Sequence, residues 1–292
     1  MPAYENRYWW SKDGLRLHYR DYGGEGGAHA DRPPILCLPG LTRNARDFEG
    51  LAGRLAGQWR LIAVDFRGRG ESAYAKDPMS YVPLTYVQDI EGLLAELAID
   101  RYVAIGTSLG GIVTMLLAGT ARARLAAALL NDIGPDIDPR GLSRIRGYVG
   151  KGGSFPTWMH AARAVAEVNA ATHSDCAIED WLAMAKRLYR LNSAGRIVLD
   201  YDMKIAEPFR VPGNEAGPDM WRALASLHDV PTLVVRGERS DLLTTATAER
   251  MVATLGDARL VGVPGVGHAP LLTEPALIEP IDDLLARAMA TA

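Results

Sequence analysis

Six short stretches of the chain are apolar at nearly every position, the pattern of strands buried on both faces of a parallel sheet. They occupy residues 35–38, 59–66, 102–106, 126–131, 232–237 and 258–263. Between several of them, apolar residues recur at helical spacing over 84–99, 109–119 and 245–256. Alternating strands and helices form right-handed βαβ units. The pattern therefore predicts an α/β fold, with a mostly parallel central sheet and helices on both faces.

The two ends of the chain depart from this alternation. Near the N-terminus, apolar and aromatic residues flank the turn signal Asp13-Gly14, which predicts a β-hairpin. The last helical stretch, residues 275–290, carries Pro280 inside it. Because proline suits the start of a helix, we expect the regular helix to begin near Pro280.

Residues 135–215 interrupt the pattern, since they contain no convincing buried strand. They do contain amphipathic stretches at 157–169 and 178–191, which predict helices. We therefore predict a helical cap at 135–215, inserted into a core domain of residues 1–134 and 216–292. Apolar residues at helical spacing are more often core than pocket. The cap side chains that are candidates for lining a substrate pocket are Trp158, Met159, Trp181 and Tyr189.

Composition and charge narrow the class of protein. Apolar residues make up 48% and charged residues 23% of the chain, as in soluble globular proteins. A net charge of -3 argues against nucleic-acid or membrane partners, which require basic surfaces. The chain has only two cysteines, no signal-peptide pattern and no run of ~18 apolar residues. We expect a cytoplasmic protein in which Cys37 and Cys176 are free thiols.

The residues Gly106-Thr107-Ser108-Leu109-Gly110 match the motif G-x-S-x-G, between a predicted strand and a predicted helix. Where a strand turns abruptly into a helix, the two backbones approach, so the positions two before and two after the serine must be small. The helix N-terminus directs partial positive charge toward a developing oxyanion. We predict that Ser108 is a nucleophile, the alternative being an ordinary Ser/Gly loop.

A serine nucleophile needs a base, and the base needs a carboxylate to orient it. Of six histidines, His268 lies in a Gly/Pro loop after the strand 258–263, at the edge where α/β sheets bind ligands. Asp241 follows the strand 232–237, and the competing Asp132 follows 126–131. We favour Asp241, which gives the order Ser108, Asp241, His268 for nucleophile, acid and base.

These residues resemble the α/β-hydrolase fold superfamily over nearly the whole chain. The segment LPGLTRN at 38–44 lies where such proteins carry an HG-x loop, DFRGRGES resembles their D-x-R-G-x-G-x-S turn, and GVGHAP resembles their catalytic-histidine loop. The resemblance implies an oxyanion hole formed by the backbone N–H groups of Leu41 and Leu109. Pro39 stands where many members have histidine, which removes one donor and one stabilising contact from this loop. Arg43 and Asn44, next to the loop, are candidates for contacting a polar substrate group.

The activity predicted from these residues is hydrolysis of a small-molecule carboxylic ester or lactone through an acyl-enzyme. No metal or cofactor is expected, because the sequence lacks an H-E-x-x-H motif and a nucleotide-binding glycine loop in the right context. Two alternatives stay open: cleavage of a C–C bond in a β-diketone or ring-cleavage product, and a non-catalytic ligand receptor. The oligomeric state is open, with a homodimer as one option.

Overall fold

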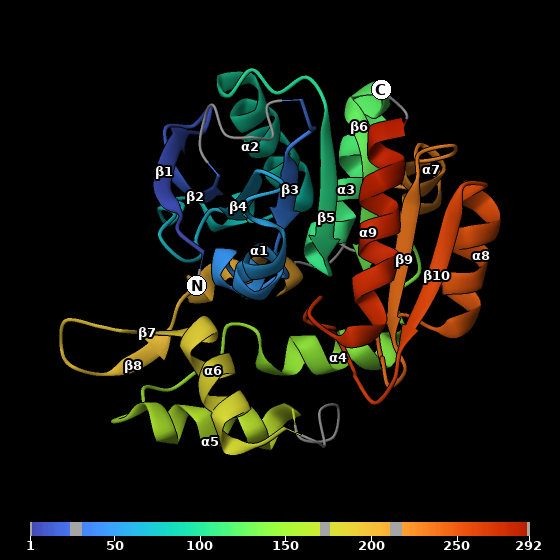
Figure 1. Cartoon of the computed structure of the whole chain (residues 1–292). Coiled ribbons are helices and arrows are strands. Elements are labelled where there is room, and N and C mark those ends of the chain that lie inside the picture. The colour runs from blue at the N-terminus through green and yellow to red at the C-terminus, as the bar shows by residue number, and fades with distance from the viewer. Residues whose placement is uncertain (1, 24–30, 170–175, 211–217, 291–292) are drawn as a thin grey trace.

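Eight strands form one sheet in the part of the chain that this computed structural model describes, residues 2–23, 31–169, 176–210 and 218–290 (Figure 1). Their order is β1-β2-β4-β3-β5-β6-β9-β10. In this sheet β1 pairs antiparallel with β2 and β2 pairs antiparallel with β4, whereas the remaining pairings are parallel. The bounds are β1 Glu5–Trp10, β2 Arg16–Tyr22, β3 Ile35–Leu38, β4 Leu61–Asp65, β5 Tyr102–Thr107, β6 Leu125–Asn131, β9 Thr232–Gly237 and β10 Ala258–Val263.

All six strands predicted from continuous apolar runs are present, each within two residues of its predicted bounds, and the hairpin at Asp13-Gly14 is confirmed. The register places Leu38 opposite Gly106 and Gly106 opposite Leu130. The loops that follow β3, β5 and β6 therefore begin side by side at one edge of the sheet.

Helices cover both faces of the sheet. One apolar cluster joins the sheet to α2, α3, α7 and α8, and a second joins the opposite face to α1 and α9. The bounds are α1 Glu49–Leu55, α2 Pro83–Glu96, α3 Leu109–Ala121, α7 Met220–Ala225, α8 Thr245–Leu255 and α9 Pro275–Ala290. Short 3-10 helices lie at Ala45–Phe48, Pro78–Ser80 and Arg122–Arg124.

The predicted start of the last helix is wrong, because α9 begins at Pro275 rather than near Pro280. Pro275 occupies the first helical position, where a missing N–H costs no intrahelical hydrogen bond. Pro280 lies inside the helix and is buried with Leu277 and Ile281 against the sheet. Burial of this face supports the first turns of α9 despite the hydrogen bond that Pro280 cannot donate.

After β6 the chain leaves the sheet and, before it returns at α7, lies over the edge to which the parallel strands point (Figure 1). We call this part of the chain the inserted segment. It comprises α4 Pro139–Tyr148, α5 Trp158–Asn169, α6 Ile178–Leu188, the hairpin β7 Tyr189–Leu191 with β8 Ile197–Leu199, and a 3-10 helix at Met203–Arg210. The hairpin replaces the last residues of the helix predicted at 178–191. A small apolar cluster of its own packs α5 against α6.

The end of α6 is tied to the sheet domain through the main-chain carbonyl of Arg187. That oxygen accepts hydrogen bonds from Asn44 Nδ2 at 2.9 Å and from Arg46 Nη2 at 3.0 Å. Arg46 also pairs with Asp200, just after β8. Both donors belong to the loop after β3, so this loop carries one corner of the inserted segment.

The structure leaves both cysteines, Cys37 and Cys176, as free thiols, and Cys37 is fully buried in β3. Burial raises the pKa of the Cys37 thiol far above its usual value. None of the described helices is long and apolar enough to cross a membrane.

Candidate active site

Ser108 lies at the turn between β5 and α3, with φ 52° and ψ −116°. The turn requires small neighbours: a Cβ added to Gly110 would lie 2.0 Å from the Leu38 carbonyl oxygen. A Cβ added to Gly106 would lie 2.4 Å from the Gly110 carbonyl oxygen. The predicted close approach of strand and helix backbones is therefore confirmed, and it forces Ser108 into a positive-φ conformation that non-glycine residues rarely adopt.

The structure brings His268 between Ser108 and Asp132. His268 Nε2 is 2.9 Å from Ser108 Oγ, and Nδ1 is 2.8 Å from Asp132 Oδ2. An ionised carboxylate only accepts hydrogen bonds, so Nδ1 carries the proton and Nε2 accepts from the serine hydroxyl. Nε2 is thereby positioned to remove the Ser108 proton.

Asp132 is fully buried at the end of β6, and protein donors hold both of its oxygens. Oδ1 accepts from the Gly237 N–H at 2.8 Å, and Oδ2 accepts from Ser240 Oγ at 2.6 Å. These donors stabilise the ionised carboxylate and fix the oxygen that faces His268.

The structure corrects the prediction that Asp241 orients His268. Its carboxylate is bound in a bidentate ion pair by Arg144 of α4, at 2.6 and 2.8 Å. This hydrogen bonding by Arg144 holds the pKa of Asp241 below its usual value. Because β6 and β9 are adjacent parallel strands, both acids lie at the same edge of the sheet. Arg144 from the inserted segment binds the carboxylate of Asp241 there. The competing candidate, Asp132, is the residue that contacts His268.

Two residues outside the motifs position the loop of His268. Asn131 donates from Nδ2 to the Pro270 carbonyl at 2.8 Å, just beyond the histidine. A Cβ added to Gly237 would lie 2.5 Å from the Gly267 carbonyl oxygen, so this loop packs directly on the end of β9. Neither contact has a local signature in the sequence, because each joins segments far apart along the chain.

The Leu41 and Leu109 amides, the predicted oxyanion donors, follow β3 and begin α3, respectively. Neither N–H donates a hydrogen bond to another group in the described part of the chain. Two buried side chains hold the loop after β3: Arg69 Nε donates to the Leu41 carbonyl at 2.9 Å, and Asp65 Oδ1 accepts from the Ala45 N–H at 2.7 Å. Arg69 thus supplies a contact to a loop in which Pro39 has no N–H to donate.

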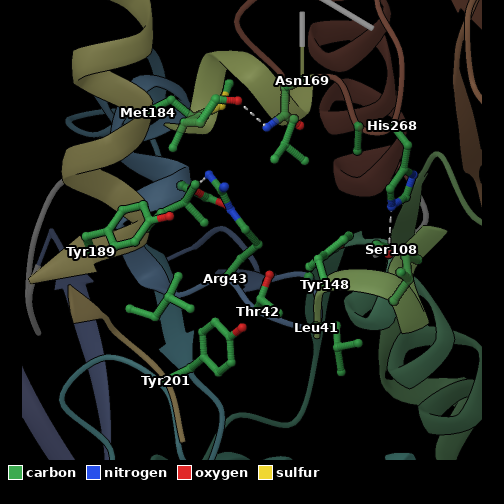
Figure 2. Close-up of a pocket in the computed structure, with 18 of the residues that line it drawn as sticks. Leu41, Thr42, Arg43, Ser108, Tyr148, Asn169, Met184, Tyr189, Tyr201 and His268 are labelled. Carbon is green, nitrogen blue, oxygen red and sulfur yellow. Dashed lines mark hydrogen bonds and ion pairs between the residues drawn. The ribbon is translucent and has the colours of Figure 1, made fainter. Parts of the chain in front are cut away.

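A cavity of about 300 Å³ opens above Ser108 and His268, between the sheet edge and the inserted segment (Figure 2). Two predicted candidates line it, Arg43 and Tyr189. Arg43 also forms a bidentate ion pair with Asp47, at 2.6 and 2.5 Å. Other lining residues that the sequence analysis did not single out are Thr42, Arg144, Tyr148, Lys151, Asn169, Met184 and Tyr201.

The prediction that Trp158 and Trp181 line the pocket is wrong. Trp181 is buried in the apolar cluster between α5 and α6, and Trp158 packs against the same cluster. Met159 is 39% exposed and lies outside the cavity lining. The large apolar side chains of these amphipathic helices hold the helices together, while Arg144 and Tyr148, four residues apart on one face of α4, reach the cavity.

The chain is similar to known hydrolases along nearly its whole length. The model of the Alpha/beta hydrolase family matches residues 35–280. A 3-hydroxybutyrate-oligomer hydrolase from Cupriavidus necator is 35% identical, with 90% of each chain covered. A 2-(acetamidomethylene)succinate hydrolase from Mesorhizobium japonicum is 27% identical, over 86% of this chain and 88% of that one. The crystal structure of an alpha/beta hydrolase from Novosphingobium aromaticivorans is 57% identical with a TM-score of 0.92, covering 98% of this chain and 99% of that one. The chain therefore belongs to the alpha/beta hydrolase family of enzymes.

Proposed function

We propose that this protein is a serine hydrolase that cleaves a carboxylic ester of a small molecule through an acyl-enzyme. One observation carries the proposal: His268 lies within hydrogen-bonding distance of both Ser108 Oγ, at 2.9 Å, and the buried Asp132, at 2.8 Å, at the base of a cavity. This is the arrangement in which an imidazole removes the serine proton and a carboxylate stabilises the resulting imidazolium.

The reaction has two halves with the same proton carrier. Ser108 Oγ attacks the ester carbonyl while its proton moves to His268 Nε2, and the N–H groups of Leu41 and Leu109 stabilise the oxyanion. His268 then gives that proton to the departing alcohol oxygen, which leaves the acyl-enzyme. In the second half, His268 removes a proton from water, whose oxygen attacks the acyl carbon, and the carboxylic acid is released as Ser108 is reprotonated.

An ester is the favoured substrate because of the relative that is 35% identical over 90% of both chains. Its name makes it a hydrolase of 3-hydroxybutyrate oligomers. Hydroxy-acid units joined to one another are linked by ester bonds, which the same serine chemistry cleaves. Lactones, which are cyclic esters, stay within the same proposal.

The test is turnover of p-nitrophenyl esters from acetate to decanoate, beside a small lactone panel, by wild type and Ser108→Ala. We expect Ser108→Ala and His268→Ala each to lower kcat by about 10³-fold or more, and the double variant to cost little extra because the two residues act as a unit. Stoichiometric labelling of Ser108 by a phosphonate without ester or lactone turnover would point instead to C–C bond cleavage. Absence of labelling would favour a ligand receptor.

A further inference from the structure

The wall of the cavity carries an excess of positive charge. Among the described residues, the cationic side chains that line it are Arg43, Arg144 and Lys151, against one carboxylate, Asp47. Arg144 is neutralised by Asp241 on the sheet domain. The positive charge that Asp241 does not balance belongs to Lys151 and to the cluster of charged side chains around Arg43.

Arg43 lies next to the nucleophile. A Cβ added to Gly40 would lie 3.2 Å from Arg43 Cγ and 3.7 Å from Ser108 Cβ, so only Gly40 separates the two side chains. From there the side chain extends into the cavity on the side of Met184 and Tyr189, across from His268 (Figure 2). The guanidinium is therefore within reach of a substrate that is bonded to Ser108.

The carboxylate that pairs with Arg43 serves a second arginine as well. Asp47 Oδ1 lies 2.5 Å from Arg43 Nη2 and 3.7 Å from Arg187 Nε. Burial is the main cause that lowers the pKa of Arg187, and its Nε is buried without a hydrogen-bond partner in the described part of the chain. Two guanidiniums thus share one carboxylate at this end of the cavity.

The other acidic groups near Arg187 are already engaged. Glu49 pairs with Arg20 at 2.6 Å, and Asp180 accepts a hydrogen bond from the Ala177 N–H at 2.9 Å. Both carboxylates raise the pKa of Arg187 by their charge, but in the described part of the chain neither forms an ion pair with it. An anionic ligand group in the cavity would complete the charge balance of this cluster.

Tyr148 and Lys151 add hydrogen-bond donors to the same wall. Burial raises the pKa of Tyr148, so its hydroxyl stays protonated and donates, and both Arg43 and Arg144 lie close enough to act on it electrostatically. Lys151 is exposed at the cavity and forms no ion pair with the described residues. A guanidinium, a phenol and an ammonium group together match the acceptor oxygens of a carboxylate.

We propose that the cavity selects esters whose acyl chain ends in a free carboxylate, which lies against Arg43 and Tyr148. The acyl side is favoured because His268 must protonate the departing alcohol, and Arg43 lies across the cavity from His268 (Figure 2). The substrates of this class are monoesters of dicarboxylic acids and similar acid-terminated esters. This inference rests on the proposed serine hydrolase function.

The test compares mono-p-nitrophenyl adipate with its methyl ester, two substrates of similar length that differ in charge. We expect kcat/KM to be about tenfold or more higher for the acid, as one charge-assisted hydrogen bond provides. In Arg43→Gln this ratio falls toward one, through a higher KM for the acid. As a control, Arg54→Gln removes an arginine that pairs with Asp282 outside the cavity, and the ratio stays as in wild type.

The inference is overturned if the two esters have equal kcat/KM in wild type, or if Arg43→Gln lowers both values by the same factor. Failure of the proposed function looks different, since neither ester would then show Ser108-dependent turnover. In that case, calorimetry with adipate itself tests the site without catalysis. Adipate binding to Ser108→Ala that is lost in Ser108→Ala/Arg43→Gln supports the carboxylate site, and equal affinity for both proteins overturns it.

Discussion

Arg69 donates a hydrogen bond from Nε to the main-chain carbonyl of Leu41 at 2.9 Å, although its side chain is fully buried beside the rings of Tyr81 and Tyr86. The bond fixes the loop that presents the Leu41 N–H, a proposed oxyanion donor. Pro39 offers this loop no N–H of its own. Arg69 is therefore expected to act as a positioning residue.

Replacing Arg69 with methionine should lower kcat by about 10- to 100-fold and leave KM within threefold, because a misplaced oxyanion donor weakens binding of the transition state more than of the substrate. Arg69→Lys should recover part of the loss. Steady-state kinetics, normalised by phosphonate titration of active sites, separates this effect from misfolding. A loss that disappears on normalisation would mean that Arg69 only supports folding.

Asp132→Asn should lower kcat by about 10⁴-fold, because an amide at this position favours the wrong tautomer of His268. Asp241→Asn should change kcat by less than about tenfold, since its carboxylate is bound by Arg144 and not by His268. The two variants replace the same group on neighbouring strands, so each is the other's control. A severe loss in Asp241→Asn with a mild one in Asp132→Asn would reverse the assignment.

The choice between these acids shows where prediction from the sequence stops. Strands that are buried on both faces of the sheet have continuous apolar sequences, so the sequence predicts their bounds to within two residues. Ser108 is predicted from its motif after one of these strands, and His268 from its loop after another. Asp132 and Asp241 both follow strands that end at this edge of the sheet. The contacts that distinguish them are those of Gly237 and Ser240 with Asp132 and of Arg144 with Asp241, and each joins segments far apart along the chain, so none has a local signature.

The residues that line the cavity could not be predicted from the sequence for a related reason. Trp158 and Trp181 have the size and polarity expected of a pocket lining, yet helical periodicity alone does not say which apolar face meets another helix. In the structure, the apolar faces that carry Trp158 and Trp181 pack at the contact between α5 and α6. The cavity receives polar side chains such as Arg43 and Tyr148 instead.

Gly110→Ala should prevent formation of the native turn at Ser108, since its Cβ would lie 2.0 Å from the Leu38 carbonyl oxygen. Gly92 is the matched control: it lies in α2 with nothing within 4 Å of an added Cβ, and alanine there should stabilise the protein by about 0.5–1 kcal/mol. Soluble yield and urea unfolding compare the two. A folded, fully active Gly110→Ala protein would contradict the close approach of β3 and α3.

The Arg144–Asp241 ion pair should contribute to stability only above acidic pH. A carboxyl pKa lowered in the folded state adds stability that is present above the unfolded-state value, about 3.9, and is lost as pH falls through the folded-state value. Both side chains are partly exposed, so the bridge is worth at most about 1 kcal/mol. Arg144→Gln should therefore lower the free energy of unfolding at pH 7, and its difference from wild type should shrink as the pH falls below about 3.9.

Urea unfolding of both proteins at several pH values measures this difference. Arg140→Gln serves as the control, because Arg140 pairs with Asp138 at the exposed start of the same helix and its loss should change nothing measurable. A gap between Arg144→Gln and wild type that persists unchanged in acid would show that Arg144 stabilises the fold by packing rather than by its charge.

The bonds from Asn44 and Arg46 to the Arg187 carbonyl have a consequence for how molecules pass in and out. They attach the α6 end of the inserted segment to the same loop that carries Leu41, so lifting this end would break those bonds and disturb the loop. The α6 end of the segment is thus held to the sheet domain by hydrogen bonds, so we expect substrate to enter and product to leave on the α5 side. The rate of product exchange would then depend on α5, while the hydrogen bonds at α6 keep the loop beside Ser108 in place between turnovers.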